Sequence, residues 1–264
     1  MVTSNVINKH RVLVKRDSFI QTFHELYCSI WVLGDAFEEA AFASILSRAG
    51  CYKADSMEKA DIVIFTGGPD INPALYGEEP IPGIVFNEKR DAEDLAAYKI
   101  CYELGIPMVG ICRGAQFLHA MNGGKLYQDV NGHNSTHSIV DVIKRTTIGN
   151  VSSVHHQMCM DNKSTEGFEI IATAKVADVK KINKDSRHDI TVPDIEAFFY
   201  RDTCCLGFQG HPEYKGYSAY TLWFTEKIRD YISYNCDLKP MGSVLRLTPE
   251  HLEQRALKRE KEMN

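Results

Sequence analysis

The 264-residue sequence lacks the features that mark several common classes of protein. Its formal charge is −5 at pH 7, without the basic footprint of a nucleic-acid-binding protein, so no nucleic-acid partner is expected. No apolar run approaches the roughly 20 residues that cross a bilayer, so no membrane partner is expected either. Residues 1–17 lack the apolar segment of a secretory signal, and we therefore expect a cytoplasmic protein.

Metal, redox and nucleotide motifs are also missing. The eight cysteines contain no C-x-x-C pair, and without a secretory signal most of them are expected to be reduced, buried and inert. The adjacent Cys204 and Cys205 are assigned to a buried strand without a function. The chain contains no G-x-S-x-G serine elbow and no Walker-type G-x-x-x-x-G-K-[ST], so we predict neither a serine nucleophile nor an ATP-binding loop.

What the sequence does contain is an alternation of short apolar strands and amphipathic helices. Residues 61–65 and 106–111 are continuous apolar runs, which are typical of strands buried on both faces of a sheet. Helices are predicted over 36–50, over 88–104 and from Gly114 onward. The alternation predicts an α/β fold with three layers, in which helices flank a mostly parallel central sheet.

Apolar spacing predicts the buried side of the first two helices. For the helix over 36–50 the predicted face is Phe37, Ala40, Ala41, Ser44 and Ile45. For the helix over 88–104 it is Ala92, Leu95, Ala96, Ile100 and Leu104.

The second half is richer in strand-like runs and ends in a further helix. The runs cover 137–145, 168–176, 195–201 and 204–210, and the helix covers 216–232. We expect a single domain over 1–264, with its core at about 30–235 and a charged extension at 237–264. A helix with a Thr248 cap is predicted in that extension.

A cysteine stands where a predicted strand turns into a predicted helix. Residues 110–114 read G-I-C-R-G, a relative of the elbow that holds a hydrolase nucleophile on a sharp turn. On such a turn the Cys112 sulfur is exposed at the end of the strand, and the Arg113 N–H faces the same space. The helix dipole then favours the thiolate. The alternative is that Cys112 is a buried core thiol like the other cysteines.

The segment 207–214, G-F-Q-G-H-P-E-Y, offers a base for this nucleophile. His211 follows another predicted strand, and Glu213 points the same way if the segment is extended. The Glu213 carboxylate would then bond one ring nitrogen of His211 while the other nitrogen faces the sulfur. The alternative is a surface histidine that pairs locally with a carboxylate.

A glycine-rich loop, T-G-G-P at 66–69, follows a third predicted strand. The N–H of Gly68 is predicted to be a second oxyanion donor beside that of Arg113. An ordinary Gly-Pro turn is the alternative. Because ligands bind outside the carboxyl ends of strands in open parallel sheets, we expect this loop, Cys112 and His211 to converge.

Together these motifs resemble a known family. The chain resembles the class I (triad-type) glutamine amidotransferases, and within them the branch of γ-glutamyl hydrolase and γ-glutamyl-GABA hydrolase, over about residues 30–235. The resemblance depends on "TGGPDINPALYGE", "NEKRDAEDLAAYKICYELGIPMVGICRGAQFLHAMNGGKLYQDV", "VSSVHHQ" and "GFQGHPE", which occur in the family's order. It implies a flavodoxin-like topology and a reaction that needs no metal ion and no organic cofactor.

The resemblance also implies roles for particular residues. Cys112, His211 and Glu213 form a catalytic triad, with an oxyanion hole from the backbone of Gly68 and Arg113. Residues implied to bind the substrate are Gln116, His155 and His156. Residues interpreted as charges at a helix start, with a structural role near the site left open, are Arg90, Asp91 and Glu93.

Two departures from the family pattern are visible. Gly210 stands where the branch has an aromatic or aliphatic residue, and we expect it to widen the pocket or loosen the histidine strand. A polar insertion at 178–194 is expected to form a hairpin or loop.

Three functions are compatible with these motifs. The favoured one is a glutamine-hydrolysing amidotransferase subunit, whose ammonia goes to an ATP-dependent ligase or synthetase partner docked on the C-terminal extension. The second is a stand-alone hydrolase of γ-glutamyl amines or peptides. The third is an inactive triad fold that serves as a binding or regulatory module. The sequence leaves a homodimer open.

Overall fold

The computed structural model describes residues 28–183, 192–214 and 218–234, positions 26 and 216, and four short strands near the termini. Those four strands form two hairpins, β1 (Leu13–Arg16) with β2 (Phe19–Thr22) and β16 (Lys239–Met241) with β17 (Val244–Arg246). None of the helices in the described parts of the chain combines the length and apolarity that crossing a membrane requires.

A nine-stranded sheet forms the centre of the molecule, in the order β10-β9-β12-β14-β15-β6-β5-β3-β4. Its parallel strands are β4 (Tyr52–Lys53), β3 (Ser29–Leu33), β5 (Ile62–Phe65), β6 (Met108–Ile111) and β15 (Cys205–Phe208). Taken in chain order, these five strands have the order 2-1-3-4-5, which is the flavodoxin-like order. The α/β prediction is therefore confirmed.

The other half of the sheet is antiparallel. It consists of β14 (Asp194–Tyr200), β12 (Phe168–Ala174), β9 (His137–Asp141) and β10 (Thr146–Val151). Two strand pairs lie beside it, β7 (Leu126–Tyr127) with β11 (Met158–Cys159) and β8 (Asp129–Val130) with β13 (Lys180–Lys181). The predicted strand runs of the second half are thus present.

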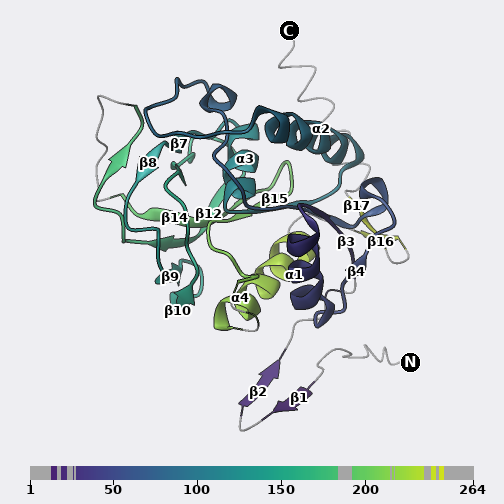
Figure 1. Cartoon of the computed structure of the whole chain (residues 1–264). Helices are drawn as coiled ribbons and strands as arrows, with labels where there is room; N and C mark the ends of the chain where they lie inside the picture. Colours follow the sequence, from purple (N-terminus) through teal and green to yellow (C-terminus); the bar gives the residue numbers. More distant parts are fainter. Residues whose placement is uncertain are drawn as a thin grey trace, which may run out of the picture.

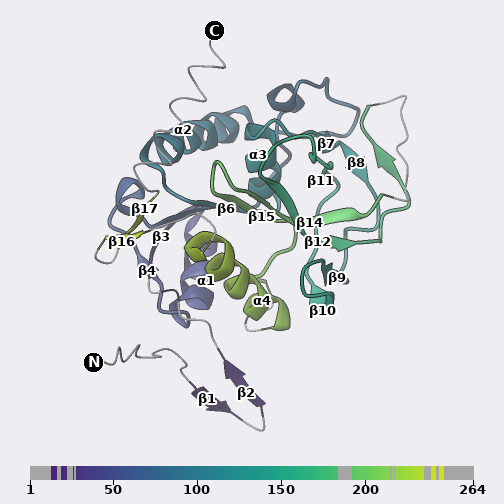
Figure 2. The ribbon, with the colours of Figure 1, turned by 180° about the vertical axis from the view of Figure 1, so that it is seen from behind.

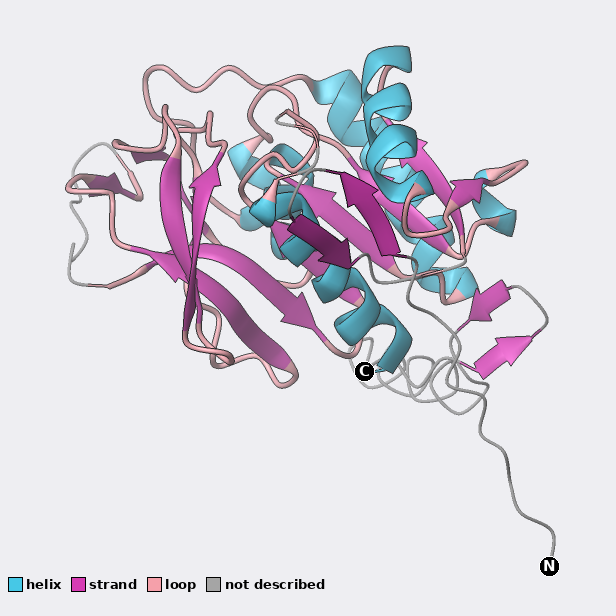
Figure 3. Cartoon of the chain, turned by 90° about the horizontal axis from the view of Figure 1, so that it is seen from below, coloured by secondary structure: helices cyan, strands magenta, loops and turns pink. Residues whose placement is uncertain are grey.

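Helices cover both faces of the sheet. α2 (Glu88–Leu104) and α3 (Arg113–Met121) lie on one face, and α1 (Ala36–Ser47) and α4 (Ala219–Ile228) lie on the other (Figures 1 and 2). Seen from below, helices cross in front of the central strands (Figure 3). Shorter helical turns occur at Met57–Lys59, Pro73–Tyr76 and, as a π-helix after α4, Arg229–Tyr234.

The core divides into two layers along these faces. In β5, Ile62 and Ile64 pack in the cluster that contains α1 and α4, whereas Val63 and Phe65 pack in the cluster that contains α2 and α3. This alternation is what the two-residue period of a strand produces. The side chains of this continuous apolar run therefore pack on both faces of the sheet, as the sequence predicted.

The predicted buried faces of the first two helices are largely wrong, although Ile45 of the first helix is buried as predicted. α1 buries Phe42, Ile45 and Leu46, whereas Phe37 is 72% exposed. α2 buries Asp91, Asp94, Ala97 and Cys101, whereas Leu104 is 43% exposed. The error for α2 has a clear cause. Its buried face contains Asp91 and Asp94, which pair with the Arg113 side chain of α3, and a search for apolar residues does not detect such a face.

The remaining predictions concern segments that the structure describes only in part. Within the 178–194 insertion, β13 pairs with β8, and residues 184–191 are not described. The predicted helix in the 237–264 extension also lies outside the described residues. Among the described cysteines, six are buried thiols outside any disulfide and Cys204 is disulfide-bonded; the six are Cys28, Cys51, Cys101, Cys112, Cys159 and Cys205.

Candidate active site

Cys112 occupies a sharp turn between β6 and α3. It is the N-cap of α3 and has φ 50° and ψ −109°, a conformation that non-glycine residues seldom adopt. Glycines on either side make the turn sterically possible. A Cβ on Gly110 would lie 2.5 Å from the Gly114 carbonyl oxygen, and one on Gly114 would lie 2.1 Å from the Phe65 oxygen. The G-x-C-x-G spacing therefore reflects close backbone contacts.

The Cys112 side chain is less exposed than the sequence suggested. Only 5% of the residue is accessible, because the loop at 152–157 lies over it, and the sulfur is 4.0 Å from the Val154 carbonyl oxygen. The expectation of an exposed sulfur is therefore wrong. Cys112 instead lines a small pocket.

His211 and Glu213 form a hydrogen-bonded pair beside Cys112. Nδ1 of His211 lies 2.7 Å from Oε1 of Glu213, and both side chains are buried. Residues 212–214 form a turn rather than the extended segment predicted, but the turn still brings the i and i+2 side chains together. Because a carboxylate only accepts hydrogen bonds, Nδ1 carries a proton and Nε2 is the nitrogen left for other partners.

The surroundings of His211 favour its charged form. Burial by itself lowers the pKa of His211, but the hydrogen bonds and charges of Cys112 and Glu213 outweigh burial and raise it to about 10. Tyr214 stacks on the imidazole with ring centroids 4.2 Å apart and planes 6° apart. Sequence reasoning missed this contact, which covers one face of the ring.

The loop after β5 contacts both Cys112 and His211. A Cβ on Gly67 would lie 3.0 Å from Cε1 of His211 and 3.9 Å from Cβ of Cys112, so the two side chains meet at this glycine. Gly68 has φ 145°, which strongly favours glycine, and lines the same pocket. The structure therefore brings together the three strand ends that were expected to converge.

Arg113 has its backbone and its side chain in different environments. As the first residue of α3, its N–H has no intrahelical acceptor and lies next to the Cys112 turn. Its guanidinium is buried, pairing through Nη2 with Asp91 at 2.5 Å and through Nη1 with Asp94. Its Cδ lies 3.1 Å from the place where a Cβ on Gly68 would be.

The acidic side of this cluster connects α2 to the glycine-rich loop. Asp94 also accepts from Nε of Arg90 at 3.0 Å, and Arg90 donates through Nη2 to the Thr66 hydroxyl at 3.1 Å. Burial raises the pKa of Asp91, and Arg113 counteracts that shift. Arg90 and Asp91 are therefore tied into the support of the site, which the sequence left open.

Asp94 and Glu93, near the start of the same helix, differ in their relation to this cluster. Sequence reasoning missed Asp94, although its i+4 spacing from Arg90 was a usable signal. Glu93, in contrast, is exposed and pairs with Lys89 at 3.7 Å, away from this cluster. Of the three residues interpreted as helix-start charges, Asp91 is the acidic one in the first turn of α2, whereas Glu93 lies beyond that turn.

The pocket in front of Cys112 measures about 300 Å³. Its lining residues are Gly68, Pro69, Asp70, Gly83, Val85, Cys112, Gln116, Val154, His155, His156 and Gln157. The sequence-predicted residues Gln116, His155 and His156 are thus all present in its wall. Gln116 donates through Nε2 to the Gln157 carbonyl at 2.8 Å, which ties α3 to the 152–157 loop.

The two adjacent histidines differ in environment, and their pKa values are shifted in opposite directions. Nδ1 of His155 lies 2.9 Å from the Gln157 carbonyl oxygen, and burial lowers the pKa of His155 well below its usual value. Nε2 of His156 lies 3.0 Å from Oδ2 of Asp70, and this hydrogen bond raises the pKa of His156. Sequence reasoning missed Asp70, which lies 86 positions away in the chain.

Gly210 does not widen the pocket. A Cβ at this position would lie 2.4 Å from Cγ1 of Val151 and 2.8 Å from the Tyr220 hydroxyl. The space that a larger residue would occupy is filled by these neighbours. The expectation of a wider pocket is therefore wrong, and the histidine strand is closely packed at this position.

Known proteins resemble this chain in sequence and in fold. A family model described as Peptidase C26 matches residues 45–213. The chain belongs to this family. It is 29% identical over 205 residues to the glutamine amidotransferase-like protein YvdE of Lactococcus lactis, covering 69% of this chain and 80% of YvdE. It is 29% identical over 131 residues to the glutamine-hydrolyzing GMP synthase of Clostridium botulinum, covering 48% of this chain but 22% of that enzyme.

A solved structure has a fold similar to that of this chain. It is that of a Thermoplasma acidophilum protein named for one subunit of a GMP synthase, with a TM-score of 0.50 and 14% identity. It covers 91% of this chain and all of its own. The class I glutamine amidotransferase-like fold predicted from the motifs is thereby confirmed.

Proposed function

We propose that this protein hydrolyses the γ-amide of glutamine or of a γ-glutamyl compound through a Cys112–His211–Glu213 triad. The observation that carries the proposal is that these three side chains lie together and that Cys112 lines the pocket. Cys112 stands on a strained turn at a helix start, and His211 is held by Glu213 at 2.7 Å. A buried core thiol needs neither the turn nor a charged imidazole beside it.

In the proposed reaction, the Cys112 thiolate attacks the amide carbon and forms a tetrahedral intermediate. Protonated His211 gives its proton to the leaving nitrogen, the C–N bond breaks, and a γ-glutamyl thioester with Cys112 remains. His211 then takes a proton from water, which attacks the thioester and releases glutamate and the thiolate. Glu213 orients the imidazole and stabilises its charged form.

The backbone N–H groups of Gly68 and Arg113 are proposed to hold the developing oxyanion. Gly68 lines the pocket with Cys112, and Arg113 directly follows it in the chain. Removing one such donor costs about 3 kcal/mol in related sites. The buried Arg113 side chain supports this arrangement, because it packs against Gly68 while anchored to two aspartates.

The pocket favours a small substrate with charged ends. Its volume of about 300 Å³ is at the lower limit of ligand sites. At one side Asp70 offers a carboxylate for an ammonium group, and His156, whose pKa is raised, offers a positive charge for a carboxylate. We propose that Gln116 and His155 shape the wall that faces the γ-glutamyl chain.

An amidotransferase subunit is favoured over a stand-alone hydrolase. Relatives that are named glutamine amidotransferase-like or glutamine-hydrolyzing GMP synthase support the use of glutamine. We propose that the ammonia passes to an ATP-dependent ligase or synthetase, with the charged 237–264 extension as the docking element. A stand-alone hydrolase of the γ-glutamyl-GABA type has the same triad and differs in its leaving group.

The decisive experiment measures glutamate release from glutamine and from γ-glutamyl amines, with and without a candidate ligase. Cys112→Ala is expected to abolish release from every substrate, whereas Cys101→Ala, which changes a buried cysteine of α2, retains it. Turnover in Cys112→Ala would overturn the nucleophile assignment. Release from glutamine that rises when the ligase is added supports the amidotransferase, and release only from γ-glutamyl amines supports the stand-alone hydrolase.

A further inference from the structure

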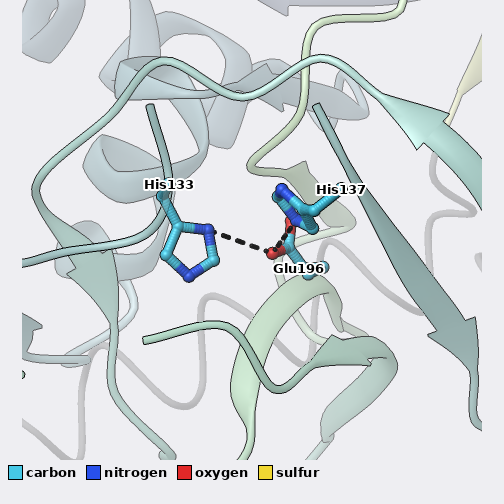
Figure 4. Close-up of side chains that lie close together, drawn as sticks. All are labelled: His133, His137 and Glu196. Carbon is cyan, nitrogen blue, oxygen red and sulfur yellow. Dashed lines mark hydrogen bonds and ion pairs between the residues drawn. The ribbon is translucent and has the colours of Figure 1, made fainter. Parts of the chain in front are cut away.

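Behind the proposed active site lies a second cluster of polar side chains that the triad does not use. His133, His137 and Glu196 each direct a potential ligand atom to one point, and these atoms lie within 4.8 Å of one another (Figure 4). Nδ1 of His133 is 3.4 Å and Nε2 of His137 is 2.7 Å from Oε1 of Glu196. We propose that this cluster binds a Zn²⁺ ion.

The outer nitrogens of the two histidines determine which atoms face inward. Nε2 of His133 lies 3.2 Å from the Asp194 carboxylate, and Nδ1 of His137 lies 3.4 Å from the Ser135 carbonyl oxygen. Both oxygens can only accept, so both outer nitrogens carry protons. In the neutral rings, the inner nitrogens therefore present lone pairs to the Glu196 carboxylate.

Lone pairs that face a carboxylate require a cation between them. Asp194 does not create this demand, because Lys180 pairs with it at 2.7 Å and the Val176 and Ala177 N–H groups also bond it. Glu196, in contrast, is 1% exposed, and its other oxygen, Oε2, has no hydrogen-bond partner. Nδ1 of His133 is likewise buried without one.

A proton on the inner nitrogen of His137 would give a hydrogen-bond partner to only some of the polar atoms in the cluster. It explains the 2.7 Å contact to Glu196, but it leaves Nδ1 of His133 and Oε2 of Glu196 unpartnered. Tetrahedral Zn²⁺ with bonds of about 2.0–2.1 Å places its ligand atoms about 3.4 Å apart, which is the distance between His133 and Glu196. A metal ion would replace the His137 hydrogen bond and widen that contact.

The ligand set favours zinc over hard cations. Two imidazoles and one carboxylate suit Zn²⁺, whereas Mg²⁺ and Ca²⁺ prefer oxygen ligands. The Asp194–His133 bond is also the outer carboxylate contact that metal-bound histidines commonly have. The three side chains are buried, so the site is closed to substrate, and a fourth ligand such as water would complete the tetrahedron.

The proposed ion would stabilise the loop that closes the pocket. The His133 carbonyl accepts from the Ser153 hydroxyl at 2.9 Å and from the His155 N–H at 3.1 Å, and the His133 and His155 rings lie 4.6 Å apart. Binding to Glu196 of β14 would therefore fix His133, and through it the 152–157 loop, to the central sheet.

The test uses the full-length chain and measures metal binding without reference to turnover. The protein is stripped with a chelator and titrated with Zn²⁺, and bound metal is counted by elemental analysis. We expect about one equivalent with a raised melting temperature, as for a structural zinc site. Co²⁺ is expected to give a visible d–d spectrum without the charge-transfer absorption of a thiolate ligand. The Cys112→Ala variant should bind the same amount.

Two variants and a control locate the site. His137→Asn and Glu196→Gln should lose the bound metal and the rise in melting temperature, whereas His156→Asn, which removes a neighbouring histidine outside the cluster, should keep both. Wild-type protein that binds no stoichiometric Zn²⁺ would overturn the proposal, since protons alone would then neutralise the cluster. Metal retained by folded His137→Asn, or a thiolate band with Co²⁺, would also overturn it.

Discussion

At the scale of single residues, the backbone of Cys112 is the most unusual feature of the site. A non-glycine residue at φ 50° carries strain of the order of 1–3 kcal/mol, which the surrounding packing must offset. Gly110 and Gly114 relieve the contacts that side chains would make here, and the hydrogen bond from the Cys112 N–H to the Phe208 oxygen at 2.7 Å holds the turn to β15. The strained turn places the thiol at the start of α3, where it lines the pocket.

Glu213→Gln is predicted to lower kcat far more than it raises KM. The amide retains the size of the side chain but removes the charge that stabilises protonated His211 and holds its tautomer. A loss of the order of 10²–10⁴-fold in kcat is expected by analogy with other triads. Steady-state kinetics with glutamine or a γ-glutamyl amine would measure it. A change confined to KM would show that Glu213 acts on binding instead.

The pH dependence should follow His211. Its pKa of about 10 lies above the usual 6.5, so the imidazole is protonated at neutral pH and loses its proton only as the pH rises through about 10. The stabilisation that this proton gives the folded state is complete below about pH 6.5 and is lost between there and about pH 10. We expect kcat/KM to fall on this basic limb, and the limb to move to lower pH in Glu213→Gln. If the basic limb stays at the same pH in Glu213→Gln, the limb does not report the titration of His211.

At the scale of secondary-structure elements, a buried ion cluster joins α2, α3 and the loop after β5. Arg113 of α3 reaches Asp91 and Asp94 of α2, and Arg90 continues from Asp94 to Thr66 beside the glycine-rich loop. This chain of contacts holds the Cys112 turn and the loop that contains Gly68 in fixed positions relative to each other. It also explains why α2 buries acidic residues.

Arg113→Met is predicted to destabilise the protein by about 3–5 kcal/mol, because two buried aspartates lose their cation. The backbone N–H of residue 113 remains, so any loss of activity reports on the position of the loop. The matched control is Lys89→Met, which breaks the exposed pair with Glu93 and should have little effect. Chemical denaturation compares the two variants. Equal stabilities would contradict a structural role for the cluster.

At the scale of the whole molecule, one sheet connects both halves of the chain. The parallel strands lead to Cys112, to the loop that contains Gly68 and to His211, whereas β9 and β14 of the antiparallel half contain His137 and Glu196 of the proposed metal site. β15 pairs with β6 on one side and with β14 on the other, so the two halves share a continuous hydrogen-bonded ladder. We propose a single domain on this basis.

A single domain is expected to unfold in one cooperative transition. The chain has two tryptophans, and they pack in the clusters on opposite faces of the sheet, Trp31 with α2 and α3 and Trp223 with α1 and α4. Single-tryptophan variants made with Trp31→Phe and Trp223→Phe should give fluorescence transitions that coincide in denaturant. Separate midpoints in the two variants would indicate that the faces unfold independently.

The sequence by itself determined the features that short-range chemistry controls. The cysteine turn follows from glycines two positions to each side, the His211–Glu213 pair follows from nearby positions in one turn, and the strand and helix alternation follows from apolar periodicity. Only the tertiary structure decided the buried face of α2, the Asp70–His156 contact and the cluster of His133 and Glu196. Their partners lie on separate elements, up to 86 positions apart in the chain. Such contacts depend on how the sheet and helices pack, and a local sequence pattern does not show which distant residues will meet.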